Sequence, residues 1–244
     1  MTVDLAIDAS GPIVRIELNR PDAANSMTLD MMRQLSAALA RHGADPHARV
    51  IALSGRGDHF CRGRDAAGGP QPGEPKPSAY HVRQTVIAPV LDVYQAIAAC
   101  PLPVVAIVQG EALGFGAAIA TIADVTIASD DARFGFPEIE HGIPPALAMA
   151  SAIRNVPPKA LTWLVYSAQT IDAAQAKEIG IVSHLLRRDR FQGDAEEMLW
   201  TLAGRPRLVL ETIKRYQSKA TGQPLDMASE YAGTLLALVG TAAS

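Results

Sequence analysis

The sequence predicts an α/β fold followed by a helical C-terminal region. Short apolar runs, such as Val50–Leu53 and Val104–Val108, have the length of buried strands and are closed by glycine-bearing turns. Segments with helical periodicity separate these runs, which is typical of strands joined by crossover helices. The last part of the chain is helical, with breaks at two Gly-Xaa-Pro tripeptides. We therefore expect a core over residues 1–190 and a C-terminal helical region over residues 191–244.

Composition and charge exclude several classes of protein. The 244 residues are 48% hydrophobic, which is ample for a large core. A formal charge of −3 without any basic run argues against nucleic-acid binding. No run of about 18 apolar residues occurs, so we expect a cytoplasmic protein with no membrane partner. Cys61 and Cys100 are too isolated for a disulfide framework or a metal cluster, and we expect two free thiols and no metal.

The N-terminal elements follow from alternation and capping. Val14–Leu18 alternates apolar with charged residues, the pattern of a half-buried strand. Thr28 is a candidate N-cap for a helix that Gly43 ends, and the apolar residues of this helix lie on one face. Val50–Leu53 is continuously apolar, so we expect a strand that is buried on both faces.

A segment rich in glycine and proline, residues 66–77, is unsuited to any regular element. Helical spacing of apolar residues resumes after it and predicts a helix that faces the core. The residues of this apolar stripe are Val86, Val90, Val93, Tyr94 and Ile97.

The stretch from Pro103 to Ala146 is where we expect the chemistry. Its apolar run ends at Gly110, and a second glycine turn at residues 114–116 precedes an alanine-rich helix. Glycine lets a ligand approach the backbone, and the first turn of a helix leaves N–H groups that can hold developing negative charge. Glu138 follows in an apolar setting, where desolvation strengthens a carboxylate as a base. This combination indicates proton abstraction next to a carbonyl.

Two neighbours of Glu138 are secondary candidates for the same chemistry. Glu140 and His141 could add a second titratable group, because histidine titrates near neutrality. Adjacent side chains on an extended segment point to opposite faces, however, and this weakens a joint role.

The remaining elements are interpreted as scaffold. Thr170 or Asp172 caps a helix that Gly180 ends. Ile181–Val182 is expected to begin the last strand of the core, and Lys214 is expected to be solvated.

Several ordered motifs in this chain resemble the crotonase (enoyl-CoA hydratase/isomerase) superfamily. They are GDHFCRGRD, PVVAIVQGEALGFGAAIA, ADVTIASDDARFGFPEIEHGI and TIDAAQAKEIGIVSHLL. The resemblance covers Ile13 to Leu186 and implies a spiral of ββα repeats in two near-perpendicular sheets, followed by a helical trimerisation region. It also implies an acyl-CoA thioester as substrate and self-association into a homotrimer or hexamer. Coenzyme A enters as part of the substrate, and no cofactor is implied.

The same resemblance implies roles for individual residues. The N–H groups of Arg64 and Phe115 bind the thioester oxygen, and Glu138 acts as general acid/base. The family usually has a small residue in place of Arg64, whose side chain either reaches a phosphate or carboxylate or points to solvent, and usually has glycine in place of Phe115. The implied substrate-binding positions are Ala24, Gly63, Gly110, Gly114 and Gly116.

Departures from the family pattern bear on the reaction. Two-carboxylate hydratases of this family have a second glutamate at the position of Ala118, so this chain has one base, which favours isomerisation of 3-enoyl-CoA to 2-enoyl-CoA. Hydration of 2-enoyl-CoA is the first alternative, and a catalytically silent acyl-CoA-binding or scaffold protein is the second. Ala146 stands where dehalogenases and some ring isomerases have aspartate, which disfavours those reactions. Residues 66–77 are either a lid over the acyl pocket or a surface insertion.

Overall fold

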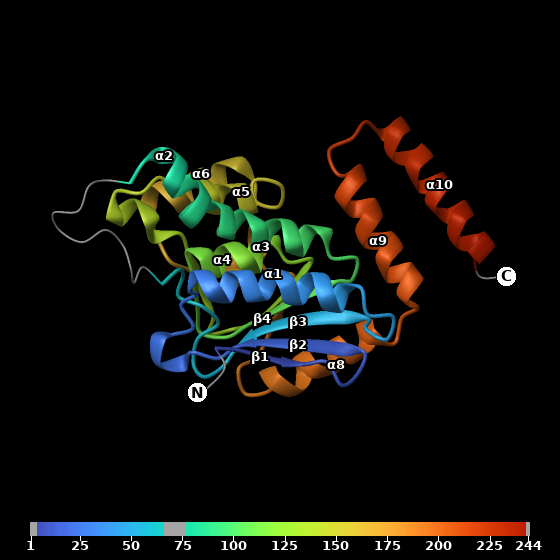
Figure 1. Cartoon of the computed structure of the whole chain (residues 1–244), viewed down its shortest axis with the longest axis horizontal. Helices are drawn as coiled ribbons and strands as arrows, with labels where there is room; N and C mark the ends of the chain where they lie inside the picture. Colours follow the sequence, from blue (N-terminus) through green and yellow to red (C-terminus); the bar gives the residue numbers. More distant parts are fainter. Residues whose placement is uncertain (1–3, 66–76, 243–244) are drawn as a thin grey trace.

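Two sheets, of six and three strands, form the centre of the protein in the computed structural model, which describes residues 4–65 and 77–242 (Figure 1). The strands are β1 (Leu5–Asp8), β2 (Ile13–Leu18), β3 (Val50–Gly55), β4 (Val104–Val108), β5 (Glu111–Leu113), β6 (Val125–Ser129), β7 (Arg133–Gly135), β8 (Ile171–Asp172) and β9 (His184–Leu186). The larger sheet has the order β1-β2-β3-β4-β6-β9 and the smaller has β5-β7-β8. The α/β prediction is therefore confirmed, whereas the lid or insertion predicted at residues 66–77 falls almost wholly outside the described residues.

Helices surround the larger sheet. The α-helices are α1 (Leu29–Gly43), α2 (Ala79–Val82), α3 (Ala88–Ala99), α4 (Phe115–Ile122), α5 (Ala146–Ala152), α6 (Pro158–Ser167), α7 (Ala173–Glu178), α8 (Phe191–Ala203), α9 (Arg207–Ala220) and α10 (Leu225–Ala242). Two 3₁₀ helices, η1 (Pro21–Ala23) and η3 (Pro137–His141), and one π-helix, η2 (Arg83–Ile87), complete the described elements. Figure 1 shows α1, α3 and α4 on one face of the larger sheet and α8 on the other.

The sheet is buried because its central strands are apolar on both faces. From β2 through β9 each neighbouring pair is parallel, with Ile16 beside Leu53 and Ala106 beside Thr126. One face belongs to the main apolar core, and the other packs with α8 through Phe191 and Leu199. The expectation that Val50–Leu53 is buried on both faces is confirmed.

Side-chain caps fix where two helices begin. The Thr28 Oγ1 accepts a hydrogen bond from the Met31 N–H at 3.1 Å, as predicted. Asp172, rather than Thr170, caps α7 through a capping box with Gln175, in which each side chain accepts from the other residue's backbone N–H.

The predicted strand start at Ile181–Val182 is wrong. The N–H groups of both residues donate to the Ala176 carbonyl, at 2.9 and 3.2 Å, and so close the C-terminal end of α7 after Gly180. Buried apolar pairs occur both in strands and at helix ends, so the apolar composition of Ile181–Val182 could not distinguish a strand from a helix end. The strand β9 begins two residues later, at His184.

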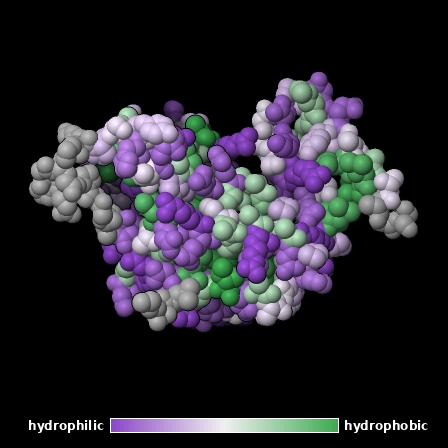
Figure 2. Space-filling model, viewed as in Figure 1, coloured by the Kyte–Doolittle hydropathy of each residue, from purple (hydrophilic) through white to green (hydrophobic). Residues whose placement is uncertain are grey.

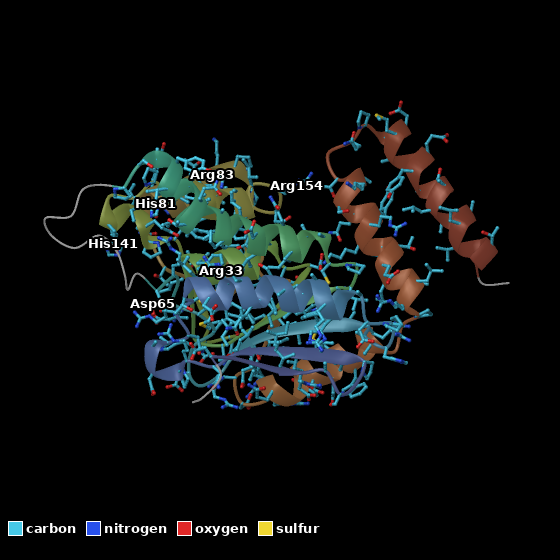
Figure 3. All side chains as sticks on the ribbon, viewed as in Figure 1. Arg33, Asp65, His81, Arg83, His141 and Arg154 are labelled. Carbon is cyan, nitrogen blue, oxygen red and sulfur yellow. The ribbon has the colours of Figure 1, made fainter. Side chains whose placement is uncertain are left out.

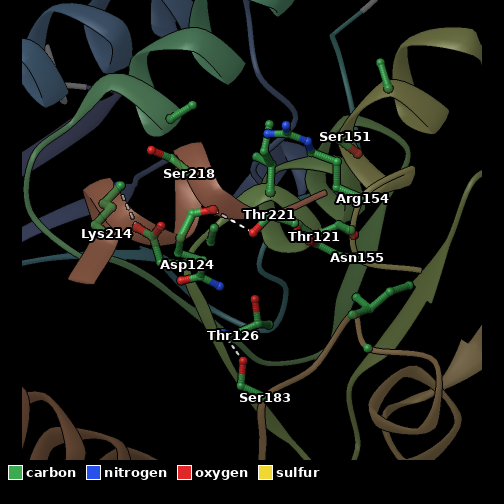
Figure 4. Close-up of a pocket in the computed structure, with 17 residues that line it drawn as sticks. Thr121, Asp124, Thr126, Ser151, Arg154, Asn155, Ser183, Lys214, Ser218 and Thr221 are labelled. Atoms are coloured by element: carbon green, nitrogen blue, oxygen red, sulfur yellow. Dashed lines mark hydrogen bonds and ion pairs between the residues drawn. The ribbon is translucent and has the colours of Figure 1, made fainter. Parts of the chain in front are cut away.

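The prediction that Lys214 is solvated is also wrong. Its side chain lies against the core, and its Nζ donates to the Ile97 carbonyl at 2.9 Å and to the Leu102 carbonyl at 3.0 Å. The third partner is the Asp124 Oδ2 at 2.6 Å, an ion pair drawn in Figure 4. Asp124 also accepts from the Val104 N–H at the start of β4, so this pair connects α9 with the central sheet.

The last two helices, α9 and α10, form a hairpin that projects from the sheet (Figure 1). The rings of Tyr216 and Tyr231 stack between them, with centroids 6.2 Å apart. Figure 2 shows a hydrophobic patch over the C-terminal half of α10, where Leu236 and Leu238 are exposed. Among the described helices, none combines the length and apolarity that crossing a membrane requires.

Candidate functional site

A cavity of about 300 Å³ lies between α3, α4 and η3. It collects most of the residues singled out from the sequence, although they come from segments far apart in the chain. The predicted residues that line it are Gly63, Arg64, Gly114, Phe115, Glu138 and His141. Ala24, Gly110, Gly116 and Glu140 are not among its lining residues.

Two glycine turns meet at the base of this cavity. The loop after β3 runs beside β5, with the Leu113 N–H donating to the Cys61 carbonyl at 2.9 Å. Gly63 (φ +114°) and Gly114 (φ +51°) both have positive φ, which side chains other than glycine's rarely adopt. A Cβ built on Gly114 would lie 3.9 Å from the Gly63 Cα, so the two turns are adjacent.

The two N–H groups that follow these glycines take no part in the backbone hydrogen bonds of the described sheets. Beside Arg64, the Met27 N–H donates to the Gly63 carbonyl and the Asp65 N–H donates to the Met27 carbonyl. Neither of these hydrogen bonds uses the Arg64 N–H. Phe115 is the first residue of α4, so its N–H has no partner within the helix. Within residues 4–65 and 77–242, neither N–H has a hydrogen-bond acceptor, while the Arg64 side chain is exposed.

Gly110 and Gly116 allow neighbouring backbone segments to pack closely against the two turns. A Cβ at Gly116 would lie 2.0 Å from the Cys61 carbonyl oxygen, and one at Gly110 would lie 2.0 Å from the Asp58 carbonyl oxygen. Both positions therefore require glycine, because backbone atoms occupy the space of a side chain. Their contribution is close packing of the two loops rather than contact with the cavity.

Ala24 lies in a loop with left-handed backbone, at φ 47°. The buried Asn25 holds this loop, since its Nδ2 donates to the carbonyls of Arg56 and His59 at 2.9 and 2.8 Å. The Ala24 carbonyl accepts from the Arg62 N–H at 3.0 Å, and Arg62 lines the cavity. The loop thus lies beside the strand-end segment that carries Gly63 and Arg64.

Glu138 presents a carboxylate to the cavity from η3. Its Oε1 would be 3.3 Å from a Cβ at Gly114, which places the carboxylate against the second glycine turn. Its Oε2 is buried and has no hydrogen-bond partner in the described part of the chain. Burial raises the pKa of Glu138 above its ordinary value, and this outweighs the lowering by its backbone hydrogen bond and by the nearby Arg64 and His141.

The extended backbone expected around Glu138 is wrong, because residues 137–141 form a 3₁₀ helix. Pro137 begins it, and Gly142, at φ 69°, ends it. Residues three apart lie on the same side of a 3₁₀ helix, so Glu138 and His141 both line the cavity while Glu140 is exposed. Figure 3 shows His141 at the same end of the molecule as His81 and Asp65.

The wall of the cavity also includes a residue that sequence reasoning assigned only to the core. Tyr94 lies on the predicted apolar stripe and is 6% exposed, yet it lines the cavity with Phe115 and Ala118. Its ring centroid is 6.0 Å from that of Phe115. Helical spacing identified its face, but this spacing is the same for a core residue and for a residue at a cavity wall.

A second cavity, of about 500 Å³, lies where α9 meets the core (Figure 4). Several of its polar lining groups are bonded to one another, as Lys214 is to Asp124 and the Asn155 Nδ2 is to the Thr121 carbonyl. The larger volume therefore holds a structural polar network. In the described residues, no group of three or more His, Cys, Asp or Glu side chains is arranged to hold a metal ion.

Comparison with known proteins gives one consistent result. A family model described as "Enoyl-CoA hydratase/isomerase" matches residues 8–239. A probable enoyl-CoA hydratase of Rhizobium meliloti (strain 1021) is 32% identical over 192 residues, which are 78% of this chain and 72% of that protein. A probable enoyl-CoA hydratase of Mycobacterium leprae (strain TN) is 28% identical over 82% of this chain and 75% of that protein. The crystal structure of an enoyl-CoA hydratase from Mycobacterium smegmatis aligns with a TM-score of 0.90 and 27% identity, covering 97% of this chain and 91% of that one.

Proposed function

Since the chain belongs to the enoyl-CoA hydratase/isomerase family, we propose that its substrate is an enoyl-CoA thioester and that Glu138 is its single general acid/base. One observation carries this proposal: among the described residues, a buried carboxylate oxygen of Glu138 without a hydrogen-bond partner lies beside two adjacent glycine turns whose N–H groups are unpaired. An unpaired buried acceptor is costly, so its persistence suits a group that exchanges protons with a ligand.

In the proposed mechanism the thioester oxygen accepts hydrogen bonds from the N–H groups of Arg64 and Phe115. These donors stabilise the negative charge that grows on the oxygen as Glu138 removes a proton from C2 of the acyl group. The C2 electron pair enters the enolate, and the double bond moves from C3–C4 to C2–C3 when Glu138 returns the proton to C4. One carboxylate used twice completes the isomerisation, so the chemistry needs no separate cofactor or metal.

Hydration of 2-enoyl-CoA is the second candidate function, because the similar proteins from R. meliloti and M. leprae are named as probable enoyl-CoA hydratases. Addition of water needs a water molecule held beside C3 and a proton delivered to C2, which two carboxylates share more easily than one. Ala118, which lines the cavity, has no ionisable group. We therefore propose that wild-type protein isomerises 3-enoyl-CoA faster than it hydrates 2-enoyl-CoA.

Ala118→Glu is expected to raise hydration of crotonyl-CoA at least about tenfold, which is less than the roughly 10²–10⁴-fold that a well-placed general acid or base contributes. The reason is that residue 118 faces the cavity, so its new carboxylate would share the work of Glu138. Loss of crotonyl-CoA absorbance measures hydration, and mass spectrometry with chromatography measures isomerisation of a 3-enoyl-CoA.

Ala118→Gln is the matched control, because it adds the same bulk without an ionisable group. Efficient hydration by wild type would contradict the isomerase preference. If calorimetric titration detected no binding of any enoyl-CoA, the enzyme proposal itself would fail. Binding without turnover would instead support a catalytically silent acyl-CoA-binding protein.

Coenzyme A is proposed to lie along the loop that contains Ala24. This loop is held by Asn25 and contacts Arg62 at the edge of the cavity, so it forms a fixed surface leading to the reacting carbons. The exposed guanidinium group of Arg64 offers positive charge for the phosphates of coenzyme A, whereas that of Arg62 is paired with the Glu111 carboxylate at 2.8 Å.

We also propose that the chain forms a homotrimer, alone or paired into a hexamer, through its C-terminal hairpin. The exposed fractions of Leu225, Leu236 and Leu238 are 83%, 71% and 58%, which is a large unpartnered apolar surface on one helix. Light scattering is expected to give three or six times the chain mass of 25.8 kDa. Leu236→Glu should lower that mass, whereas Thr234→Glu on the same helix should not. Monomeric wild type at all working concentrations would contradict the assembly.

A further inference from the structure

The backbone N–H of Arg64 takes its direction from hydrogen bonds on the opposite side of its peptide group. A trans peptide group is planar, so its N–H and its C=O point in opposite directions. The Gly63 carbonyl shares a peptide group with the Arg64 N–H, and it accepts from the Met27 N–H at 3.0 Å and from the Cys61 thiol at 3.4 Å. Because this carbonyl is held, the Arg64 N–H is turned away from the buried Met27.

The same geometry applies to the peptide group that carries the Met27 N–H. Its carbonyl belongs to Ser26 and accepts a hydrogen bond from the Arg20 Nη1 at 2.7 Å. This bond fixes the plane of the Ser26–Met27 peptide group and therefore the direction in which the Met27 N–H points. Two successive peptide groups thus connect the Arg20 guanidinium to the Arg64 N–H.

The Arg20 guanidinium is itself held in place. Its Nη1 also donates to the Asp65 Oδ2 at 2.9 Å, and the two side chains are only 23% and 22% exposed. The Arg20 backbone N–H donates to the Asn25 Oδ1 at 2.9 Å, and its carbonyl accepts from the Asn25 N–H at 2.9 Å. The guanidinium is therefore a fixed donor between the loop that contains Ala24 and the residue that follows Arg64.

We propose that Arg20 is a positioning residue, whose guanidinium orients the Arg64 N–H toward the thioester oxygen through these two peptide groups. Asp65 holds the guanidinium in the required place. This inference rests on the proposed role of the Arg64 N–H as a donor to that oxygen. Such a donor is effective only at hydrogen-bond distance from the oxygen that gains charge, so a small rotation of the peptide group weakens it. Arg20 does not line the cavity, and it acts on the reaction through the backbone.

The test uses the C=O stretching band of a bound thioester, because hydrogen bonds to the carbonyl oxygen lower its frequency. Infrared difference spectra of butyryl-CoA, isotope-labelled at the thioester carbonyl, measure this band, and wild type should lower its frequency on binding. Arg20→Met keeps an unbranched apolar stem without any N–H donor, and it should lose part of this shift.

The same variant should lower kcat for a 3-enoyl-CoA about tenfold, less than the roughly 10²–10³-fold that follows removal of an oxyanion donor. The loss is smaller because the Arg64 N–H is displaced but still present. The Kd of butyryl-CoA, from calorimetric titration, should change little, because the backbone bonds between Arg20 and Asn25 remain.

Arg207→Met is the matched control. Arg207 pairs with Glu211, with side chains 19% and 22% exposed, and donates to the carbonyls of Gly43 and Ala48 at 2.7 and 2.9 Å. It resembles Arg20 in burial and bonding but lies outside the cavity lining. Its loss should lower the free energy of unfolding without changing the infrared band or kcat.

Asp65→Ala is a second test variant, which decides the matter by the same criteria if Arg20→Met does not fold. It leaves both peptide groups and the guanidinium in the chain but removes the carboxylate that holds the guanidinium. We expect a smaller change in the infrared band and in kcat than in Arg20→Met. Because Asp65 acts through Arg20, the double variant should lose no more than Arg20→Met alone.

The outcomes separate this proposal from the one it rests on. An unchanged infrared band in Arg20→Met would overturn it, whether or not kcat fell, and so would an equal change of the band in Arg207→Met. Additive losses in the double variant would contradict the role of Asp65. If wild type did not lower the frequency of the bound thioester at all, the assignment of the Arg64 and Phe115 N–H groups would fail instead.

Discussion

Glu138→Gln is expected to lower turnover of an enoyl-CoA by roughly 10²–10⁴-fold while acyl-CoA binding changes little. The amide has the shape of the carboxylate but cannot accept a proton, and the Oε2 that it replaces has no hydrogen-bond partner in the described part of the chain. Steady-state rates with a 3-enoyl-CoA measure the loss, and calorimetric titration with a saturated acyl-CoA measures binding. Glu140→Gln separates the two carboxylates, because Glu140 is exposed and outside the cavity lining. A comparable loss of turnover in Glu140→Gln would show that the loss is not specific to Glu138 and would contradict its assignment as the base.

The pH dependence of wild type tests the same assignment. Because burial raises the pKa of Glu138, kcat/KM should fall as the pH decreases through a value above the ordinary 4.5, where the base gains a proton. The nearby His141 lowers the pKa of Glu138, so His141→Gln should move the acid limb to higher pH. An acid limb at or below 4.5 would count against a buried base.

The raised pKa of Glu138 also predicts how Glu138→Gln affects the free energy of unfolding. A carboxyl whose pKa is higher in the folded protein than in the unfolded chain favours folding below the unfolded pKa, and this contribution disappears as pH rises through the folded pKa. At neutral pH the ionised Glu138 is therefore a cost to folding. Glu138→Gln should not destabilise the protein at pH 7, so its loss of activity can be read as a chemical effect.

Asp124→Asn is expected to lower the free energy of unfolding by about 3 kcal/mol, because it leaves the Lys214 ammonium buried without a counter-ion. Removing one partner of a buried pair costs about 3–5 kcal/mol, and the lower end applies since the Asp124 side chain is 23% exposed. Urea denaturation followed by circular dichroism measures the change.

The control for this stability prediction is Lys219→Met, which removes an exposed lysine from the same helix and should cost no more than about 0.5 kcal/mol. The double variant Asp124→Asn with Lys214→Met should lose less than the sum of the two single variants, because no uncompensated charge remains. If the single losses simply add, the two side chains do not stabilise each other.

Local features were predictable because their causes lie within a few residues. The Thr28 cap, the Gly43 helix end and the apolar strand at Val50–Leu53 were all confirmed, since each depends on neighbours in sequence. The glycine turns could also be placed, because few other residues tolerate their backbone geometry. Family resemblance grouped Glu138 with Arg64 and Phe115, which line one cavity, and periodicity alone could not group them.

Features that depend on distant segments were missed. The partners of Lys214 are 90, 112 and 117 residues away, so nothing near Lys214 in sequence distinguishes it from a solvated lysine. Tyr94 looked like a core residue because the cavity beside it is formed by α4 and η3, which follow later in the chain. The sequence did not predict that Glu138 and His141 lie on the same side of one helix. The helix from Pro137 to His141 is too short to produce a recognisable period.

The ion pair of Asp124 and Lys214 also sets an order of events during biosynthesis. A chain emerges from the ribosome with its N-terminus first, and these two residues are separated by 90 positions. Until α9 has been synthesised, the carboxylate that caps the start of β4 has no cation, although Arg64, Phe115 and Glu138 have already emerged. The nascent protein therefore carries Arg64, Phe115 and Glu138 before it carries Lys214, which neutralises the acid at the start of β4. Neutralisation of Asp124 must wait for α9 to leave the ribosome.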